Sequence, residues 1–249
     1  MTEVNERRER ARADRAASPD GGSLSRAQVL DAALALIDRE GMDALSMRKL
    51  ADSLGVYPAT IYWHVGNKNQ LIAKVCQRVF DSIELADVGA VPWTAWIRQL
   101  ATSARTVLGM HPSLAADFTS TIQISASSLT LADRLMQVLE GAGFRGERLV
   151  MVYNTVLGTI FGWISAEFAT ELANSDSDWT VEYAAALNEA SDEELPAIRR
   201  NLLLVANRVF MLRWTSGRTT PMEGSFDFMV ETMIAGLEHM LVERGDRPL

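Results

Sequence analysis

The side chains best able to do chemistry in this sequence are crowded into the segment YPATIYWH, residues 57–64. The segment holds two tyrosines, a tryptophan, a threonine and a histidine, which offer hydrogen-bond donors, acceptors and flat aromatic surfaces. A row of this kind on the exposed face of a short helix is unfavourable in water unless it meets a partner. We therefore expect the segment to be a binding surface.

Patterns typical of catalytic and metal-binding sites are missing from the rest of the sequence. The three histidines, His64, His111 and His239, stand in unrelated contexts, and no HExxH, paired-cysteine spacing or glycine-rich phosphate loop occurs. The acidic residues from Asp192 to Glu194 are better explained as favourable charge at a helix start than as metal ligands. The sequence thus predicts no enzyme, no catalytic residue, no metal site and no cofactor.

The distribution of charge matters more than the formal net charge of −8. Residues 1–22 are neutral, residues 23–81 carry +1 and the remainder carries −9. All three lysines, Lys49, Lys68 and Lys74, lie in the middle segment. An anionic polymer is attracted by local positive potential, so we expect it to meet residues 23–81 and not the acidic remainder.

Start and stop signals place three short helices around the aromatic segment. Ser25 opens the first helix with a capping-box spacing, and Gly41 stops it. A second helix opens at Ser46 and stops at Gly55, and Pro58 suits the first position of a third. Short helices joined by such turns predict a helix-turn-helix unit.

Double-stranded DNA fits the outer face of the third helix. Ala59 and Thr60 can touch base edges, the tyrosine and histidine tips can bond phosphates, and Arg48 and Lys68 can supply charge. The guanidinium of Arg48 is equally suited to reading guanine. The alternative is an aromatic cluster packed inside a bundle, which explains Tyr62 fairly well and the basic flanks poorly.

The segment from Ser25 to Leu71 resembles the tetracycline-repressor family. The RKLA, LGV, T-x-YWHV and NK-x-x-L blocks all stand in register with that family. A second match resembles the spacing of its final, dimer-forming helix, at Phe226, Glu231, Ile234, Gly236, Leu237 and Glu238. The middle of the chain is only weakly similar.

The resemblance implies a homodimer that binds a near-palindromic operator, with half-sites separated by roughly 34 to 36 Å. Position by position, the resemblance implies that bases are read by Arg48, Tyr57, Pro58, Ala59 and Thr60. It implies that phosphates are held by Ser46, Tyr62, Trp63, His64 and Lys68. Since Tyr57, Pro58 and Ala59 differ from the usual tetracycline-repressor residues, we expect a different operator sequence.

Helical periodicity without strand patterns predicts an all-α chain with a helix-turn-helix domain followed by a helical effector-binding and dimerisation domain. The expected parts are a disordered arm (1–22), the DNA-binding domain (23–71), a connecting helix and linker (72–91) and the effector domain (92–249). After a helix that starts beyond Pro92, later helices are expected near 127–141, 146–172, 196–214 and 225–243. A loop, with one helical turn at Tyr183–Leu187, is expected from Asn174 to Glu194.

Several large or polar side chains beyond Trp93 are candidates for a largely apolar effector pocket. They are Trp96, Met110, His111, Phe118, Thr121, Tyr153, Asn154, Phe161 and Trp163. Periodicity cannot separate a packed face from a lined cavity, so most of them are equally well explained as core. In tetracycline binders a histidine after the fifth helix holds magnesium. The resemblance places Phe118 there, and His111 is too far along the chain to replace it.

Two further features bear on where the protein works. Leu149–Ala166 is uncharged, but its polar residues and the lack of a second such span favour a buried soluble helix, with Gly158 and Gly162 permitting close helix approach. Cys76 is the single cysteine and no signal peptide is evident, so we expect a cytoplasmic protein with a buried, unreactive thiol.

Three functions remain for comparison. The first is a regulator, expected to be a repressor, that releases DNA when an effector binds and shifts the fourth helix. The second is an architectural DNA-binding protein without a ligand, which would bind DNA without sequence preference. The third, an all-α enzyme, lacks supporting residues.

Overall fold

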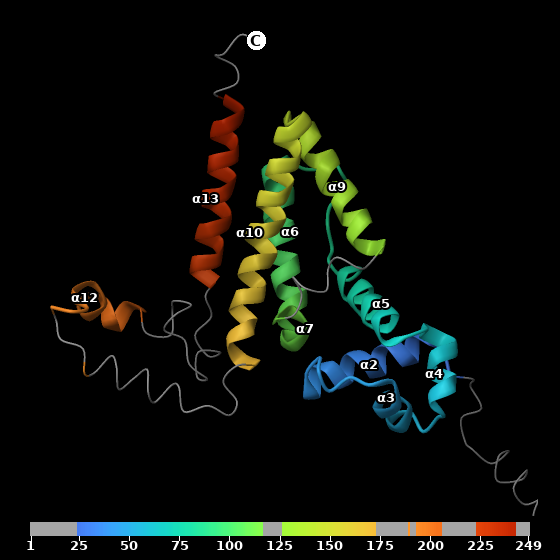
Figure 1. Cartoon of the computed structure of the whole chain (residues 1–249). Coiled ribbons are helices and arrows are strands. Elements are labelled where there is room, and N and C mark those ends of the chain that lie inside the picture. The colour runs from blue at the N-terminus through green and yellow to red at the C-terminus, as the bar shows by residue number, and fades with distance from the viewer. Residues whose placement is uncertain (1–23, 117–125, 173–188, 190–192, 206–222, 243–249) are drawn as a thin grey trace, which may run out of the picture.

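Every regular element in the described part of the chain is an α-helix. The structure, a computed structural model, describes residues 24–116, 126–172, 189, 193–205 and 223–242. Its helices are α2 (Arg26–Glu40), α3 (Met47–Ser53), α4 (Pro58–Val65), α5 (Lys68–Phe80), α6 (Trp93–Gly109), α7 (Pro112–Ala116), α9 (Ala126–Ala142), α10 (Gly146–Leu172), α12 (Pro196–Val205) and α13 (Glu223–Val242). The predicted all-α class is confirmed (Figure 1).

Capping residues fix where the first helices begin and end. The Gln28 amide donates to Ser25 Oγ at 3.2 Å, and the Ser25 amide donates to Gln28 Oε1 at 2.8 Å. This reciprocal pair satisfies two amides that the first turn leaves without helical partners. Asn67 and Gln70 make the same capping box at α5. Both helix starts are therefore where the sequence predicts them.

Helices α2, α3 and α4 enclose a small apolar core, and α5 leads away from them toward the other helices (Figure 1). The side chains of Val29, Ala33, Leu50, Ile61 and Val65 in this core are fully buried. They come from helices too short to be stable alone, so burial of these faces against one another is what keeps the unit folded.

A largely buried ion pair joins the helices of the C-terminal half. Arg105 on α6 donates to Glu167 on α10 through Nε at 3.0 Å and Nη2 at 2.7 Å, and the two side chains are 17% and 5% exposed. The same guanidinium lies 5.0 Å from the centre of the Phe226 ring on α13. Arg105 thus connects α6 to α10 through a bidentate salt bridge and to α13 through a cation–π contact.

The uncharged helix is part of this packing. Within the described residues, one helical segment, Gly146–Phe168, has the length and the apolar composition needed to cross a membrane. It contacts α6, α7, α9 and α13, and Val156, Ile160 and Ile164 on it are fully buried. A core helix of a soluble protein passes the same test of length and composition, so the run carries no indication of a membrane protein.

The later helices lie close to their predicted ranges. Those expected near 127–141, 146–172 and 225–243 are α9, α10 and α13, with ends that differ by at most two residues. The helix expected over 196–214 is described only as α12, over Pro196–Val205. The arm at 1–22, the turn at Tyr183–Leu187 and most of the loop from Asn174 to Glu194 lie outside the described residues.

We expect Glu167→Ala to destabilise the fold far more than loss of an exposed ion pair does. Removing one partner of a largely buried pair costs about 3–5 kcal/mol, a fall of about 10 °C in melting temperature for a chain of this size. Arg98→Ala is the matched control, because the Arg98–Glu231 pair also joins α6 to α13 but has side chains that are 44% and 54% exposed. Equal falls in the melting temperatures of the two variants would contradict the conclusion that the Arg105–Glu167 pair stabilises the core more than an exposed pair does.

Candidate nucleic-acid interface

The turn between α3 and α4 is set by backbone hydrogen bonds at the end of α3. The Leu54 amide donates to the carbonyls of Leu50 and Ala51, both at 3.2 Å, and the Val56 amide donates to Ala51 at 3.0 Å. Gly55 has φ 65°, a conformation that favours glycine. Ala51 is fully buried, and its small side chain lets the two helices approach closely. The predicted helix-turn-helix geometry is confirmed.

Helix α4 is anchored by Ile61 and Val65, which lie one turn apart and are fully buried. The large aromatic side chains of α4 and of its N-cap residue face the other way: Tyr57, the N-cap, is 83% exposed, Trp63 is 82% exposed and Tyr62 is 51% exposed. Their exposure contradicts the alternative interpretation of an aromatic cluster packed inside the bundle. A short helix that buries two side chains and, with its N-cap residue, exposes three aromatic ones presents a binding surface.

The far end of α4 is fixed against α5. Lys74 Nζ donates to the Val65 carbonyl at 2.8 Å, and burial, followed by the nearby Arg26 charge, lowers the pKa of Lys74. Gly66 follows with φ 80°, and a Cβ atom there would lie 1.8 Å from Gln70 Oε1. No larger residue fits this turn while Gln70 caps α5. The direction of α4 is therefore set by contacts at both of its ends.

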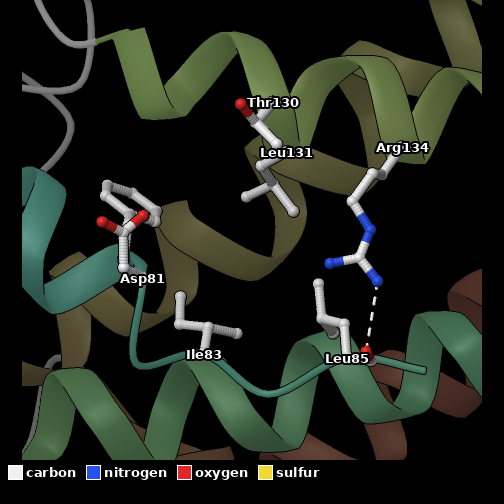
Figure 2. A pocket seen from close by; sticks show the side chains of 7 residues that line it. Asp81, Ile83, Leu85, Thr130, Leu131 and Arg134 are labelled. Carbon is white, nitrogen blue, oxygen red and sulfur yellow. Dashed lines mark hydrogen bonds between the residues drawn. The ribbon is translucent and has the colours of Figure 1, made fainter. Parts of the chain in front are cut away.

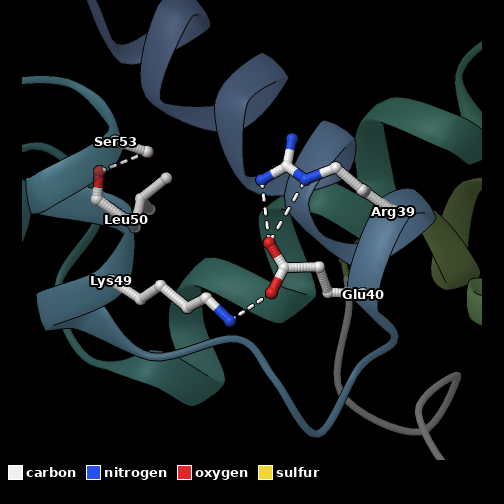
Figure 3. A network of polar contacts seen from close by, with 5 residues as sticks. All are labelled: Arg39, Glu40, Lys49, Leu50 and Ser53. Carbon is white, nitrogen blue, oxygen red and sulfur yellow. Dashed lines mark hydrogen bonds and ion pairs between the residues drawn. The ribbon is translucent and has the colours of Figure 1, made fainter.

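The positive charges near α4 differ in how they are engaged. Figure 3 shows Lys49 and Arg39 converging on Glu40, and the Lys49 hydrogen bond, then that of Arg39, lowers the pKa of this carboxyl. In the part of the chain that the structure describes, Arg48 and Lys68 have no carboxylate partner. The latter two cations remain available to phosphates or base edges.

All ten residues predicted to meet DNA are accessible. Ser46, Arg48, Tyr57, Pro58, Ala59, Tyr62 and Trp63 are exposed, and Thr60, His64 and Lys68 are half-buried. Ser46 also caps α3, where its Oγ accepts the Lys49 amide at 3.1 Å. The Trp63 and His64 rings meet edge to face with centres 4.7 Å apart, which limits how either can turn. The ten residues come from the N-cap of α3, from α3, α4 and α5, and from the turn between α3 and α4.

The described residues among those predicted to line an effector pocket are not gathered in one place. Met110 is 61% exposed, and Asn154 lies on the exposed face of α10. His111 is half-buried and contacts Asp38 of α2, with Nδ1 2.9 Å from Oδ2. Phe118 and Thr121 lie outside the described residues.

The other four predicted pocket residues pack within the bundle. Trp96 is fully buried and its Nε1 donates to the Ala86 carbonyl at 2.9 Å. Phe161 is buried with its ring 6.0 Å from that of Phe80, and half-buried Trp163 meets Phe226 edge to face. Tyr153 is half-buried, and desolvation raises its pKa. A packed core explains these positions without a ligand.

A cavity of about 180 Å³ lies where α5 ends beneath α9 (Figure 2). Its lining is formed by Phe80, Asp81, Ile83, Leu85, Thr130, Leu131 and Arg134. None of the seven predicted pocket residues that the structure describes lines it. Two of the predicted residues contact residues of the lining. The Phe161 ring lies against that of Phe80, and the Trp96 ring lies 5.9 Å from the guanidinium of Arg134.

Sequence reasoning missed Arg134, the one basic residue in the lining of this cavity. Arg134 stands on α9 between Leu131 and Leu135, on the side of a helix that packs inward, and this position was the available signal. Among the described residues no group of three or more histidine, cysteine, aspartate or glutamate side chains is placed to hold a metal ion.

Family models match both halves of the chain. Residues 29–75 match the model for bacterial regulatory proteins of the tetR family. Residues 87–241 match the model for the tetracyclin repressor-like C-terminal domain, which alone covers more than half of the chain. The first match contains α3 and α4, and the second contains α6, α10 and nearly all of α13.

Individual relatives agree with these matches. An HTH-type transcriptional regulator from Saccharopolyspora erythraea is 28% identical over 72% of this chain and 75% of its own length. The class E tetracycline repressor from Escherichia coli is 25% identical over 91% of this chain and 96% of its own. The fold is similar to that of ActR from Streptomyces coelicolor in complex with actinorhodin, with a TM-score of 0.64 and 21% identity over 86% of this chain and 99% of that one.

We expect the thiol of Cys76 on α5 to be unreactive in the folded protein. Cys76 is 1% exposed, and burial raises its pKa to about 12. At pH 8 only about one thiol in ten thousand is then the reactive thiolate. Iodoacetamide should leave the native protein unlabelled and label it fully in guanidinium chloride, as judged by mass spectrometry. Rapid labelling of the native protein would mean that the thiol is accessible.

Proposed function

The chain belongs to the tetracycline-repressor (TetR) family of bacterial regulatory proteins, and from this premise we propose that it is a dimeric repressor that leaves a near-palindromic operator when a small effector binds. Membership of the family makes the chain a transcriptional regulator with a helix-turn-helix. The proposal that it binds an operator as a repressor rests on the exposed aromatic face of α4 and its N-cap, where Tyr57 and Trp63 are 83% and 82% exposed. We place its action in the cytoplasm, where its DNA lies.

In this proposal α4 enters the major groove. Arg48 and residues 57–60 read base edges, while Ser46, Tyr62, Trp63, His64 and Lys68 hold the phosphates on either side. Charge supports this orientation, since the chain beyond residue 81 carries a net −9 and is repelled by DNA. Arg48 and Lys68 have no described carboxylate partner, whereas Lys49 is neutralised by Glu40.

A second copy of the chain fits the outer faces of α10 and α13. On α10 the exposed residues Val150, Met151 and Gly158 recur at helical spacing without a charge between them, and on α13 Phe228 is 74% exposed. A Cβ atom added at Gly158 would meet nothing within 4 Å, so packing inside the protomer does not require glycine there. A partner helix that lies close against this face would require a residue as small as glycine there.

Release by an effector is supported by the way the two halves touch. Helix α7 packs on α10 and also contacts α2, where Asp38 lies 2.9 Å from His111. A ligand that moves α7 or the end of α5 would thus move the helix-turn-helix unit as well. The structurally similar ActR has been observed in complex with actinorhodin. We propose a small, largely apolar effector in the C-terminal half of this chain too.

The proposed function predicts that selection from a random pool of duplex DNA enriches a near-palindrome, and that Arg48→Ala binds it more weakly. Loss of a base-reading arginine costs about 1–3 kcal/mol, roughly a five- to 150-fold rise in Kd measured by fluorescence anisotropy. Lys49→Ala is the matched control on the neighbouring position, and its effect should be several-fold smaller because Glu40 already neutralises Lys49. Binding without any sequence preference would instead indicate an architectural DNA-binding protein.

The dimer proposal predicts that Phe228→Asp yields a monomer with a folded helix-turn-helix. A carboxylate buried at this position in the interface would lose its hydration without gaining a partner. Sedimentation velocity should show the halved mass, circular dichroism should show unchanged helicity, and operator affinity should fall because one reading helix binds alone. Asp227→Asn on the same exposed turn is the control. A dimeric Phe228→Asp protein would refute this interface.

A further inference from the structure

A set of three side chains holds the backbone between α5 and α6. Arg134 Nη2 donates to the carbonyls of Leu85 and Ala86 at 3.1 and 2.7 Å, and Trp96 Nε1 donates to the same Ala86 carbonyl at 2.9 Å. The Ala86 amide in turn donates to Gln99 Oε1 at 2.9 Å. We name this set, Trp96, Gln99 and Arg134 around Ala86, the Ala86 clasp. It fixes a segment that has no helix or strand of its own.

The charge of Arg134 is only partly satisfied by the clasp. Its contacts are two neutral carbonyls and the face of Trp96, 5.9 Å away, and no carboxylate in the described part of the chain pairs with it. Arg78, Arg98 and Arg105, by contrast, each have a carboxylate partner. A carboxylate adds charge–charge attraction and a bidentate geometry that a neutral carbonyl cannot offer a guanidinium, so an acidic ligand can compete for this group.

The cavity beneath Arg134 defines what else such a ligand must carry. Phe80, Ile83, Leu85 and Leu131 make its wall apolar, and Thr130 adds a hydroxyl. In Figure 2 Arg134 and Asp81 lie on opposite sides of this space, so the acidic group belongs at the Arg134 end. A volume of about 180 Å³ accommodates one aromatic ring, while typical ligands need about 300 Å³ or more. A larger ligand must therefore displace part of the wall.

Resting on the effector-controlled regulator proposed above, we infer that Arg134 binds the carboxylate or phenolate of an aromatic effector and thereby opens the Ala86 clasp. The guanidinium then donates its hydrogen bonds to the acidic oxygen of the ligand and no longer to the carbonyls of Leu85 and Ala86. The segment that lines the cavity is then released from α9, and with it the end of α5, which finishes at Phe80. Because α5 packs on α2 and α4, its shift changes the placement of the reading helix.

Binding of matched acids and amides to the full-length protein tests the recognition step. The probes are benzoate, salicylate and 2-naphthoate, each against its neutral amide, measured by isothermal titration calorimetry. We expect at least one acid to bind about ten-fold more tightly than its amide, and Arg134→Gln to remove that difference. Arg145→Gln is the control, because Arg145 also donates to two backbone carbonyls, those of Glu140 and Phe144, but lies outside the cavity lining.

Operator affinity without any ligand tests the release step separately. Opening the clasp by Arg134→Gln or by Gln99→Ala should weaken operator binding about five-fold or more, the usual size of such coupling. Gln99→Ala should still prefer the acid to the amide, since it leaves the guanidinium in place, and this variant serves if Arg134→Gln does not fold.

The inference is overturned if no acid binds better than its amide, or if both clasp variants bind the operator as well as the unaltered protein. Failure of the proposed function looks different, because the unaltered protein would then show no sequence-specific DNA binding at all.

Discussion

The orientation of α4 depends on two apolar side chains one turn apart. Ile61 and Val65 are fully buried against α2 and α3, and they leave an eight-residue helix no inward position for its aromatic side chains. The cap at Gly66 and the Lys74 bond to the Val65 carbonyl hold the other end. Burial of about two side chains on a short helix is a small free-energy gain, so these backbone contacts are needed to keep the exposed face turned outward.

The same principle, a neutral backbone group held by a side chain from another helix, recurs between the two halves. Lys74 binds a carbonyl at the end of α4, and Arg134 binds two carbonyls after α5. Helix α5 is thus fixed to α4 from its midpoint, and the segment just beyond its C-terminal end is fixed to α9. The Asp38–His111 contact adds a second connection, through α7. A change at the cavity has a short, packed route to the reading surface, which a regulator requires.

Local signals predicted the DNA-binding half well, and long-range packing explains where prediction stopped. Capping boxes at Ser25 and Asn67 and the Gly55 turn lie within a few residues of the elements they control, so the sequence shows them directly. The cavity at the end of α5 forms where α5, α9 and the linker meet, which no local pattern in the sequence records. Asn154 and Ile160 share one apolar helix, yet only the latter is buried. Periodicity alone could not single out Arg134.

Photo-crosslinking tests most directly whether the face of α4 lies against DNA. An operator duplex carrying 5-iodouracil in place of thymine at each half-site is irradiated in complex with the full-length protein, and the linked peptide is identified by mass spectrometry. The account predicts links to the peptide that contains Tyr57, Tyr62 and Trp63. Links confined to any other helix, in a complex that is sequence-specific, would contradict it.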